Sequence, residues 1–369
     1  MAENTTTRIS LFNYREEAKR IIDSKPVKEQ GFIIDCIYDV NADLWGEEYN
    51  GIKVVSPFEA IKRYKNNLID KIVLPGAKGR HYLNDERLNE LLLFGVKKDD
   101  IWVSSIELWE QLDRIDRPFL KLDEYTYFDY LEFHVNDHCN LNCKNCNNFS
   151  NLVHGEVFTD YNAFERDLKR FKELVEHISF VRILGGEPLL NKEVYKYVSL
   201  VRQIYPYAEI RIVTNGTLLN RIDDILVETM KKENALFEIS AYPILYDKID
   251  GIVENLRSKG IRYRIGWIAN SFKPPIIEEF GYPLKSVNCN CIHLRNGKLA
   301  RCPLVQYLDY YNASYGTSYD GSDALIDIYD KNLTFSELWK RINTSFKLCN
   351  SCGFWRSDLP GEPWCIEKR

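Results

Sequence analysis

Three cysteines stand close together in the segment Cys139-Asn-Leu-Asn-Cys143-Lys-Asn-Cys146, which has C-x3-C-x2-C spacing. The apolar run at residues 128–135 reads as a strand, so the cysteines fall in the loop that follows it. Thiolates bind zinc and iron–sulfur clusters. A structural zinc ion needs four ligands, which His134 or His138 would complete. Three thiolates packed this tightly favour a cubane cluster with one iron left open.

Ten cysteines are spread over 369 residues, and nine of them lie between residues 139 and 365. Such clusters indicate metal binding rather than disulfides where the chain has no secretory signal, and the polar start MAENTTTRIS has none. No apolar run approaches the ~20 residues that span a bilayer. The net charge of −5 gives no basic excess for a nucleic-acid partner. We therefore expect a cytoplasmic protein that contacts neither membrane nor nucleic acid.

The first of two α/β series occupies residues 1–120 and predicts a Rossmann-like domain with a parallel sheet. A helix is expected after Ser56, which opens an S-x-x-E capping box with Pro57 at the first helical position, and another should end at Gly95. No G-x-G-x-x-G loop follows the first strand, so dinucleotide binding is not expected. The expected strands are residues 8–14, 31–39, 52–56, 71–76 and 101–105.

The second series, residues 121–280, must position the cysteine triplet, and residues 117–130 are expected to link the two series. Its alternating strands and helices are typical of an α/β barrel or part of one, which places chemistry at the carboxyl ends of the strands. From about residue 280 the pattern gives way to loops rich in Cys, Gly and Tyr, which indicates a region held together by metal. The expected strands are residues 128–135, 180–186, 209–216, 236–242 and 262–268.

These strand-end residues, taken together, resemble the radical S-adenosylmethionine (SAM) superfamily. Gly185-Gly186-Glu187-Pro188 matches the superfamily's GGEP motif after the second strand, and Thr214-Asn215-Gly216 and Ser240 follow the next two strands. The resemblance covers about residues 128–268 and implies a partial (β/α)6 radical SAM barrel. Asn145 departs from the pattern, because the superfamily often has an aromatic residue before the third cysteine.

The resemblance also implies cofactors and roles. Cys139, Cys143 and Cys146 would hold a [4Fe–4S] cluster whose fourth iron binds SAM. A flavodoxin- or ferredoxin-type reductant would deliver the electron that cleaves SAM to methionine and a 5′-deoxyadenosyl radical, which abstracts a substrate hydrogen. Glycines allow close approach to a ligand and a carboxylate complements the SAM ammonium group. The residues expected to contact SAM are Gly185, Gly186, Glu187, Pro188, Asn215 and Ser240.

The later cysteines resemble the auxiliary-cluster region called Twitch, the shortened form of SPASM, which implies one auxiliary [4Fe–4S] cluster within residues 281–369. Its expected ligands are Cys302, Cys349 and Cys352, with Cys291 preferred over Cys289 as the fourth. A four-cysteine zinc site is the alternative. Cys365 is expected to be a spare buried thiol and Cys36 a core residue.

The substrate is predicted on weaker grounds, and no catalytic residue is assigned. The first domain looks like the Rossmann-like segment of sugar-modifying and polysaccharide-biosynthesis proteins, so we expect oxidation or epimerisation of a sugar or nucleotide-sugar. The alternatives are a peptide- or protein-modifying radical SAM enzyme and a non-catalytic, zinc-stabilised binding protein. Several residues near the expected strand ends could face a substrate, although each is more often a packing or solvated residue: Tyr242, Arg264, Trp267, Arg182, His134 and Asn136.

Overall fold

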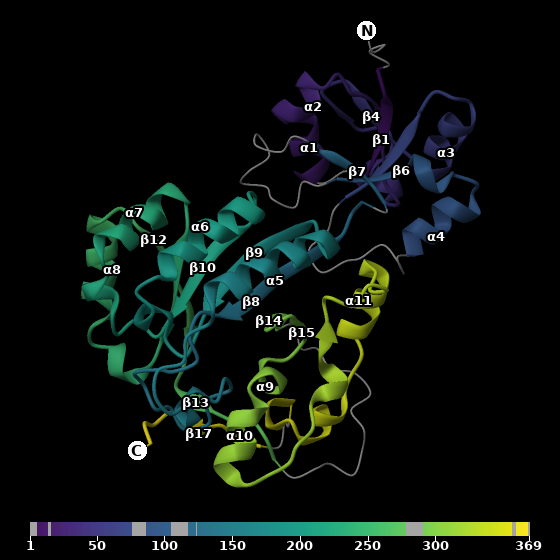
Figure 1. Ribbon diagram of the computed structural model, residues 1–369. Coiled ribbons are helices and arrows are strands. Elements are labelled where there is room, and N and C mark those ends of the chain that lie inside the picture. Colours follow the sequence, from purple (N-terminus) through teal and green to yellow (C-terminus); the bar gives the residue numbers. More distant parts are fainter. Residues whose placement is uncertain are drawn as a thin grey trace. The chain divides into compact units, whose positions relative to one another are not determined.

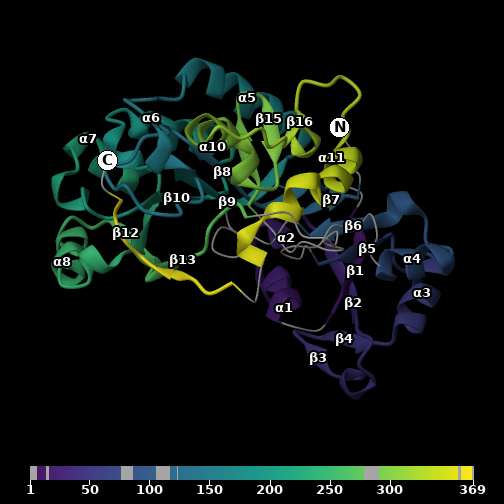
Figure 2. The same cartoon turned by 90° about the horizontal axis from the view of Figure 1, so that it is seen from below.

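The computed structural model describes residues 6–13, 16–75, 86–104, 117–122, 124–277, 291–355 and 359–367. The chain divides into two compact units, Met1–Asp129 and Tyr130–Arg369, and each contains a large sheet (Figures 1 and 2). Among the described residues, no helix is both long enough and apolar enough to cross a bilayer.

The first unit has a seven-stranded sheet in the order β3-β4-β2-β1-β5-β6-β7. Strands β4, β2, β1, β5 and β6 run parallel, and β3 and β7 are antiparallel at the two edges. Counted among themselves, the parallel strands follow the doubly wound order 3-2-1-4-5, as expected for a Rossmann-like sheet. The strands are β1 (Arg8–Phe12), β2 (Ile33–Tyr38), β3 (Glu48–Tyr49), β4 (Ile52–Val55), β5 (Lys71–Leu74), β6 (Ile101–Ser104) and β7 (Phe119–Lys121).

Helices cover both faces of this sheet: α1 (Glu16–Asp23) and α2 (Lys25–Glu29) lie on one, and α3 (Pro57–Lys65) and α4 (Glu86–Leu93) on the other (Figure 1). The expected capping box is present, because the Ser56 hydroxyl accepts a hydrogen bond from the Glu59 amide at 3.1 Å. Cys36 is buried in the core.

The stretch expected to be a linker differs from the prediction, because residues 119–121 form β7 at the edge of the sheet. Phe119 packs into the hydrophobic cluster on one face and Leu120 into the cluster on the other. Alternate residues of a strand point to opposite faces. The free energy gained by burying Phe119 and Leu120 therefore outweighs the tendency of the nearby proline and charged residues to disfavour a strand.

The second unit has an eight-stranded sheet in the order β12-β11-β10-β9-β8-β14-β15-β16. Strands β9 to β12 pair in parallel and in chain order, with β8 beside β9. Within the described residues this sheet does not close into a barrel, and no sixth parallel strand follows β12 before residue 277. The strands are β8 (Tyr127–His134), β9 (His177–Leu184), β10 (Glu209–Thr214), β11 (Leu236–Ala241), β12 (Arg262–Ile268), β14 (His293–Arg295), β15 (Lys298–Ala300) and β16 (Ile326–Asp327).

Helices α5 (Tyr161–Leu174), α6 (Val194–Ile204), α7 (Asp224–Lys232) and α8 (Ile249–Ser258) lie along the outer side of β8–β12 (Figures 1 and 2). After β12 the chain forms β13 (Ser271–Phe272), which pairs with β17 (Glu362–Pro363) near the C-terminus. The described residues from 291 onward, which we call the C-terminal part, contain three helices: α9 (Pro303–Gln306), α10 (Leu308–Tyr315) and α11 (Phe335–Ile342). The carboxyl ends of β8 to β11 line a pocket, which is described below.

Candidate active site

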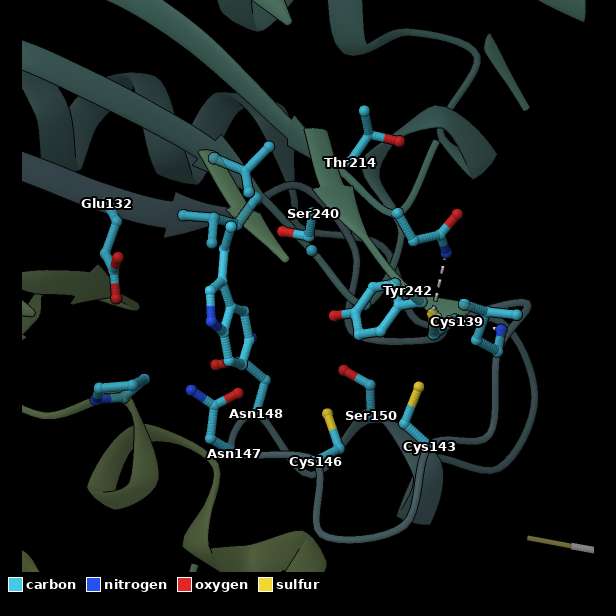
Figure 3. Close-up of a pocket in the computed structure, with 18 of the residues that line it drawn as sticks. Glu132, Cys139, Cys143, Cys146, Asn147, Asn148, Ser150, Thr214, Ser240 and Tyr242 are labelled. Carbon is cyan, nitrogen blue, oxygen red and sulfur yellow. Dashed lines mark hydrogen bonds between the residues drawn. The ribbon is translucent and has the colours of Figure 1, made fainter. Parts of the chain in front are cut away.

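A pocket opens at the carboxyl ends of β8 to β11 (Figure 3). It is lined by the cysteine loop after β8, by Gly185 and Gly186 after β9, by Asn215 after β10, and by Tyr242 after β11. In Figure 3 the labelled cysteines lie at one end of the pocket and Glu132 at the other. Residues expected from the sequence at separate strand ends thus line one pocket.

The cysteine triplet lies in the loop after β8, and N–H groups donate to its sulfur atoms. Cys139 Sγ accepts from the Leu141 amide at 3.4 Å and from Asn215 Nδ2 at 3.7 Å. Cys143 Sγ accepts from the indole Nε1 of Trp364 at 3.2 Å. Hydrogen bonds to sulfur favour the thiolate that binds metal.

Burial raises the pKa of the Cys146 thiol, and hydrogen bonds from the backbone amides of Asn148 and Ser150 oppose this shift. The donors around Cys146 therefore compensate in part for its removal from water. With the donors to Cys139 and Cys143, each of the three sulfur atoms has at least one N–H partner.

Each of the two histidines proposed as a fourth zinc ligand has a partner at its Nδ1 atom. His138 Nδ1 accepts from the Val157 amide at 3.0 Å, and its ring packs edge-on against Phe158. His134 Nδ1 lies 3.3 Å from the Asp137 carboxylate, and its ring stacks on Tyr307. Across the described residues, no three His, Cys, Asp or Glu side chains converge closely enough to hold a single metal ion.

The donor set does fit a [4Fe–4S] cluster. In a cubane, each of the three thiolates binds a different iron atom. The three sulfur atoms therefore stand farther apart than thiolates that bind one zinc ion, where each Zn–S distance is ~2.3 Å. The Asn145 side-chain Nδ2, on the loop between Cys143 and Cys146, is buried and has no hydrogen-bond partner among the described residues. Leaving a buried donor without a hydrogen-bond partner costs free energy of folding. A sulfur atom of a bound cluster would accept the hydrogen bond from Asn145 Nδ2.

The GGEP segment packs against the chain that leads into the cysteine loop. The Gly186 amide donates to Asn136 O at 2.9 Å, and the Glu187 amide donates to His138 O at 3.1 Å. Both glycines line the pocket, whereas Glu187 and Pro188 do not. The GGEP segment therefore holds the start of the cysteine loop in addition to forming a pocket wall.

Glu187 is fully buried, and its carboxylate is directed at the turn after β10. It accepts from Thr214 Oγ1 at 2.7 Å, from the Asn215 amide at 2.8 Å and from the Leu189 amide at 3.1 Å. Burial raises the pKa of Glu187 to about 7, although these hydrogen bonds lower it. The side chain positions the Thr214–Asn215 turn, and its direct contact with SAM stays a prediction.

Asn215 and Ser240 both line the pocket, as expected for groups near SAM. The Asn215 Nδ2 donates to Asn140 Oδ1 at 2.8 Å, and Asn140 Nδ2 donates to Thr217 Oγ1 at 2.8 Å. Asn140, which the sequence gave no reason to select, thus ties the cysteine loop to the turn after β10. The SAM contacts of Asn215 and Ser240 stay predictions.

Charged side chains from consecutive strands form the inner side of the sheet. Arg182 on β9 donates to Glu132 on β8 at 3.3 Å and to Glu238 on β11 at 2.9 Å. Glu238 also accepts from Arg211 on β10 at 3.1 Å and lies 3.6 Å from Arg264 on β12. Glu132 and Arg182 line the same pocket as the cysteines.

A second polar network anchors the residues just before Cys139. The Asp137 carboxylate accepts from Arg295 NH2 and from the Tyr310 hydroxyl, each at 2.7 Å. Burial alone raises the pKa of Asp137, but His134 and Arg295 lower it to about 2. Burial lowers the pKa of His134 to about 4, so its imidazole is neutral near pH 7. The C-terminal part of the unit therefore holds the cysteine loop through an ionised carboxylate.

Four of the later cysteines belong to the segment after β13. Cys302, Cys349 and Cys352 are buried in the C-terminal part, and Cys302 and Cys352 share one hydrophobic cluster with Phe149. Cys291 lines the pocket with Glu132 and Arg182, and so does Pro303, which follows Cys302. Cys289 lies outside the described residues. The prediction that the Cys365 thiol is buried is wrong, because Cys365 is exposed on the C-terminal segment.

The sequence of this site matches a known family. Residues 134–242, from the end of β8 to the residue after β11, match the model of the radical SAM superfamily. These residues form a radical SAM domain. Domains of this superfamily use a [4Fe–4S] cluster and cleave SAM reductively.

Curated relatives of this chain carry the name GTP 3′,8-cyclase. The protein of Campylobacter fetus subsp. fetus is 26% identical over 252 residues, which cover 62% of this chain and 70% of the relative. That of Thermodesulfovibrio yellowstonii is 30% identical over 141 residues, 34% of this chain and 42% of the relative.

Among solved structures, BtrN in complex with AdoMet and 2-DOIA gives a TM-score of 0.34 at 17% identity and covers 58% of this chain and 87% of that one. A score this low carries no conclusion. The fold described above rests on the chain's own strands and their pairing.

Proposed function

We propose that this radical SAM enzyme removes a hydrogen atom from a C–H bond of a small sugar-like substrate and so oxidises or epimerises it. The supporting observation is the pocket itself, which joins the three cysteines to the charged side chains of Glu132 and Arg182. A buried carboxylate and guanidinium bind hydroxyl groups through charge-assisted hydrogen bonds. Many hydroxyl groups close to a C–H bond are the chemical signature of a sugar ring.

In this proposal Cys139, Cys143 and Cys146 hold the [4Fe–4S] cluster. When bound, the cluster and SAM supply a carbon-centred radical that abstracts a hydrogen atom. Asn215 and Ser240 contact SAM from the ends of β10 and β11. The backbone of Gly185 and Gly186 forms the adjacent wall of the pocket. Tyr242, which lines the pocket and is half-buried, helps to exclude water from the reacting groups.

The fate of the substrate depends on the C-terminal cysteines. We propose that Cys302, Cys349 and Cys352, with Cys291 or Cys289, hold one auxiliary [4Fe–4S] cluster. Bound there, it would accept the second electron of an oxidation. The burial of the first three thiols in one region supports this, and the position of Cys291 at the pocket points to a site close to the substrate.

A second candidate is cyclisation of a purine nucleotide, which the name of the curated relatives favours. It uses the same hydrogen abstraction, here from a ribose. Arg182 has a buried Nε with no partner among the described residues, and an anionic substrate group would satisfy it. The two candidates differ in the product and not in the first step.

The test is anaerobic turnover of the reconstituted enzyme with a flavodoxin- or ferredoxin-type reductant. Wild type should form 5′-deoxyadenosine, and a Cys139/Cys143/Cys146→Ala variant should form none and lose about four irons per chain, as one cubane requires. Deuterated nucleotide-sugars, sugars and GTP are then compared for transfer of deuterium into 5′-deoxyadenosine.

The product mass separates the outcomes. A loss of two hydrogen atoms indicates oxidation, and an unchanged mass with a changed stereocentre indicates epimerisation. If GTP is the only one of these substrates that the enzyme turns over, the nucleotide candidate replaces the sugar proposal. An iron-free wild-type protein that contains zinc would refute both.

A further inference from the structure

The last described residues, 362–367, form a short segment that we call the C-terminal strap. It pairs on one side with β13, where Phe272 lies opposite Glu362. On the other side it pairs with the cysteine loop itself, because Ile366 forms an antiparallel bridge with Cys143. The strap therefore joins the metal-binding loop to the chain beyond β12.

Backbone and side-chain contacts hold this pairing. The Lys144 amide donates to Cys365 O at 3.0 Å, and the Glu367 amide donates to Asn142 O at 2.7 Å. Asn142 Nδ2 returns a hydrogen bond to Glu367 O at 2.8 Å across a sequence separation of 225 residues. Lys144 and Glu362 add an ion pair at 2.7 Å, although both side chains are exposed. These contacts specify where the strap residue Trp364 lies.

The Trp364 side chain points from the strap to the metal-binding loop. Its Nε1 donates to Cys143 Sγ at 3.2 Å, and its ring centroid lies 5.7 Å from that of Tyr242, a pocket residue. The Trp364 amide donates to Asn270 O at 2.8 Å, which fixes the backbone behind the ring. The indole N–H is thereby held at one of the three thiols of the triplet.

We propose that Trp364 sets the reduction potential of the cluster, an inference that rests on the proposed ligation by Cys139, Cys143 and Cys146. One-electron reduction adds a negative charge that is shared between the cluster and its thiolates. An N–H dipole at a ligand sulfur stabilises that charge, and hydrogen bonds to sulfur are an established determinant of the potential. Trp364 therefore makes the cluster easier to reduce, and it acts through Cys143 as a positioning residue.

The test is a redox titration of the reconstituted full-length Trp364→Phe variant, followed by electron paramagnetic resonance. Phenylalanine keeps an aromatic ring beside Tyr242 but has no N–H donor. We expect wild-type iron and sulfide content and a midpoint potential shifted to more negative values. Trp339→Phe, which changes a tryptophan of α11 stacked on Phe335, is the matched control and should leave the potential unchanged.

A second measurement does not depend on the variant's stability. In wild-type protein labelled with 15N at the indole nitrogen, the reduced cluster should show a 15N hyperfine coupling. An unchanged potential in Trp364→Phe, or no 15N coupling in wild type, overturns the inference while the cluster signal remains. A wild-type protein with no [4Fe–4S] signal would instead refute the proposed ligation.

Discussion

Gly186 shows why the GGEP segment requires its glycines in this chain. A Cβ at this position would lie 2.2 Å from the backbone oxygen of His138 and 2.6 Å from that of Asp137. At Gly185 the corresponding neighbour is Asn136 O, at 2.6 Å. The resemblance led us to expect that the glycines allow approach to SAM. The structure gives them a further reason, which is close contact with the chain before Cys139.

We expect Gly186→Ala to lower the free energy of unfolding by about 1–3 kcal/mol or more, since the methyl group meets backbone rather than a flexible side chain. The displaced loop should also bind less iron on reconstitution. Chemical denaturation and iron analysis measure the two effects. Gly251→Ala, in α8 with nothing within 4 Å of its Cβ, is the control and should be neutral or stabilising. Equal stability of the two variants would contradict this account.

The strands of the second unit alternate between an apolar side and a charged side. Phe133, Val181, Ile212 and Phe237 are fully buried, and the Phe133 ring packs on Phe164 of α5. The residues between them point inward, among them one charged residue on each strand from β8 to β12. The Glu238 carboxylate accepts hydrogen bonds from both Arg182 and Arg211, which are directly opposite one another and would otherwise repel.

This arrangement explains what the sequence could and could not predict. The strands, the parallel order and the strand-end motifs follow from local patterns, and the predicted α/β fold class is confirmed. The ion pairs of Arg182 join residues 50 and 56 positions apart, so they depend on strand register, which no local pattern specifies. A charged residue within an apolar run was nevertheless a usable signal. Trp364 carried none, because its partner Cys143 is 221 residues away.

Arg182→Met tests the inner charged side of the sheet. The change removes the guanidinium partner of the buried Glu132 carboxylate and leaves only His293 Nδ1, at 3.4 Å. Breaking a buried ion pair costs at most about 3–5 kcal/mol. A double variant with Glu132→Gln should recover part of this loss, because no unpaired charge remains. Lys169→Met removes an exposed pair on α5 and should cost less than about 1 kcal/mol. Thermal and denaturant unfolding measure all three, and equal losses for Arg182→Met and Lys169→Met would refute the role of Arg182.

At the scale of the whole molecule, the chain combines two units with separate cores. In the first, one hydrophobic cluster lies on each face of the doubly wound sheet. Tyr125 and Tyr127, which follow β7, are nearly fully buried in one of these clusters. The sequence placed the domain boundary at residue 120. The first compact unit extends to Asp129, and both aromatic side chains belong to its core.

We therefore propose that residues 1–129 fold as an independent domain and that a fragment ending at residue 121 is less stable. The shorter fragment keeps all seven strands of the sheet but loses both tyrosines. Removing a large buried aromatic side chain from a core costs about 3–5 kcal/mol, which is a large part of the total stability of a domain this size. Circular dichroism should show a cooperative thermal transition for fragment 1–129 and a transition at lower temperature, or none, for fragment 1–121. Identical transitions would show that Tyr125 and Tyr127 belong to the linker, as the sequence first indicated, and that the first core is complete without them.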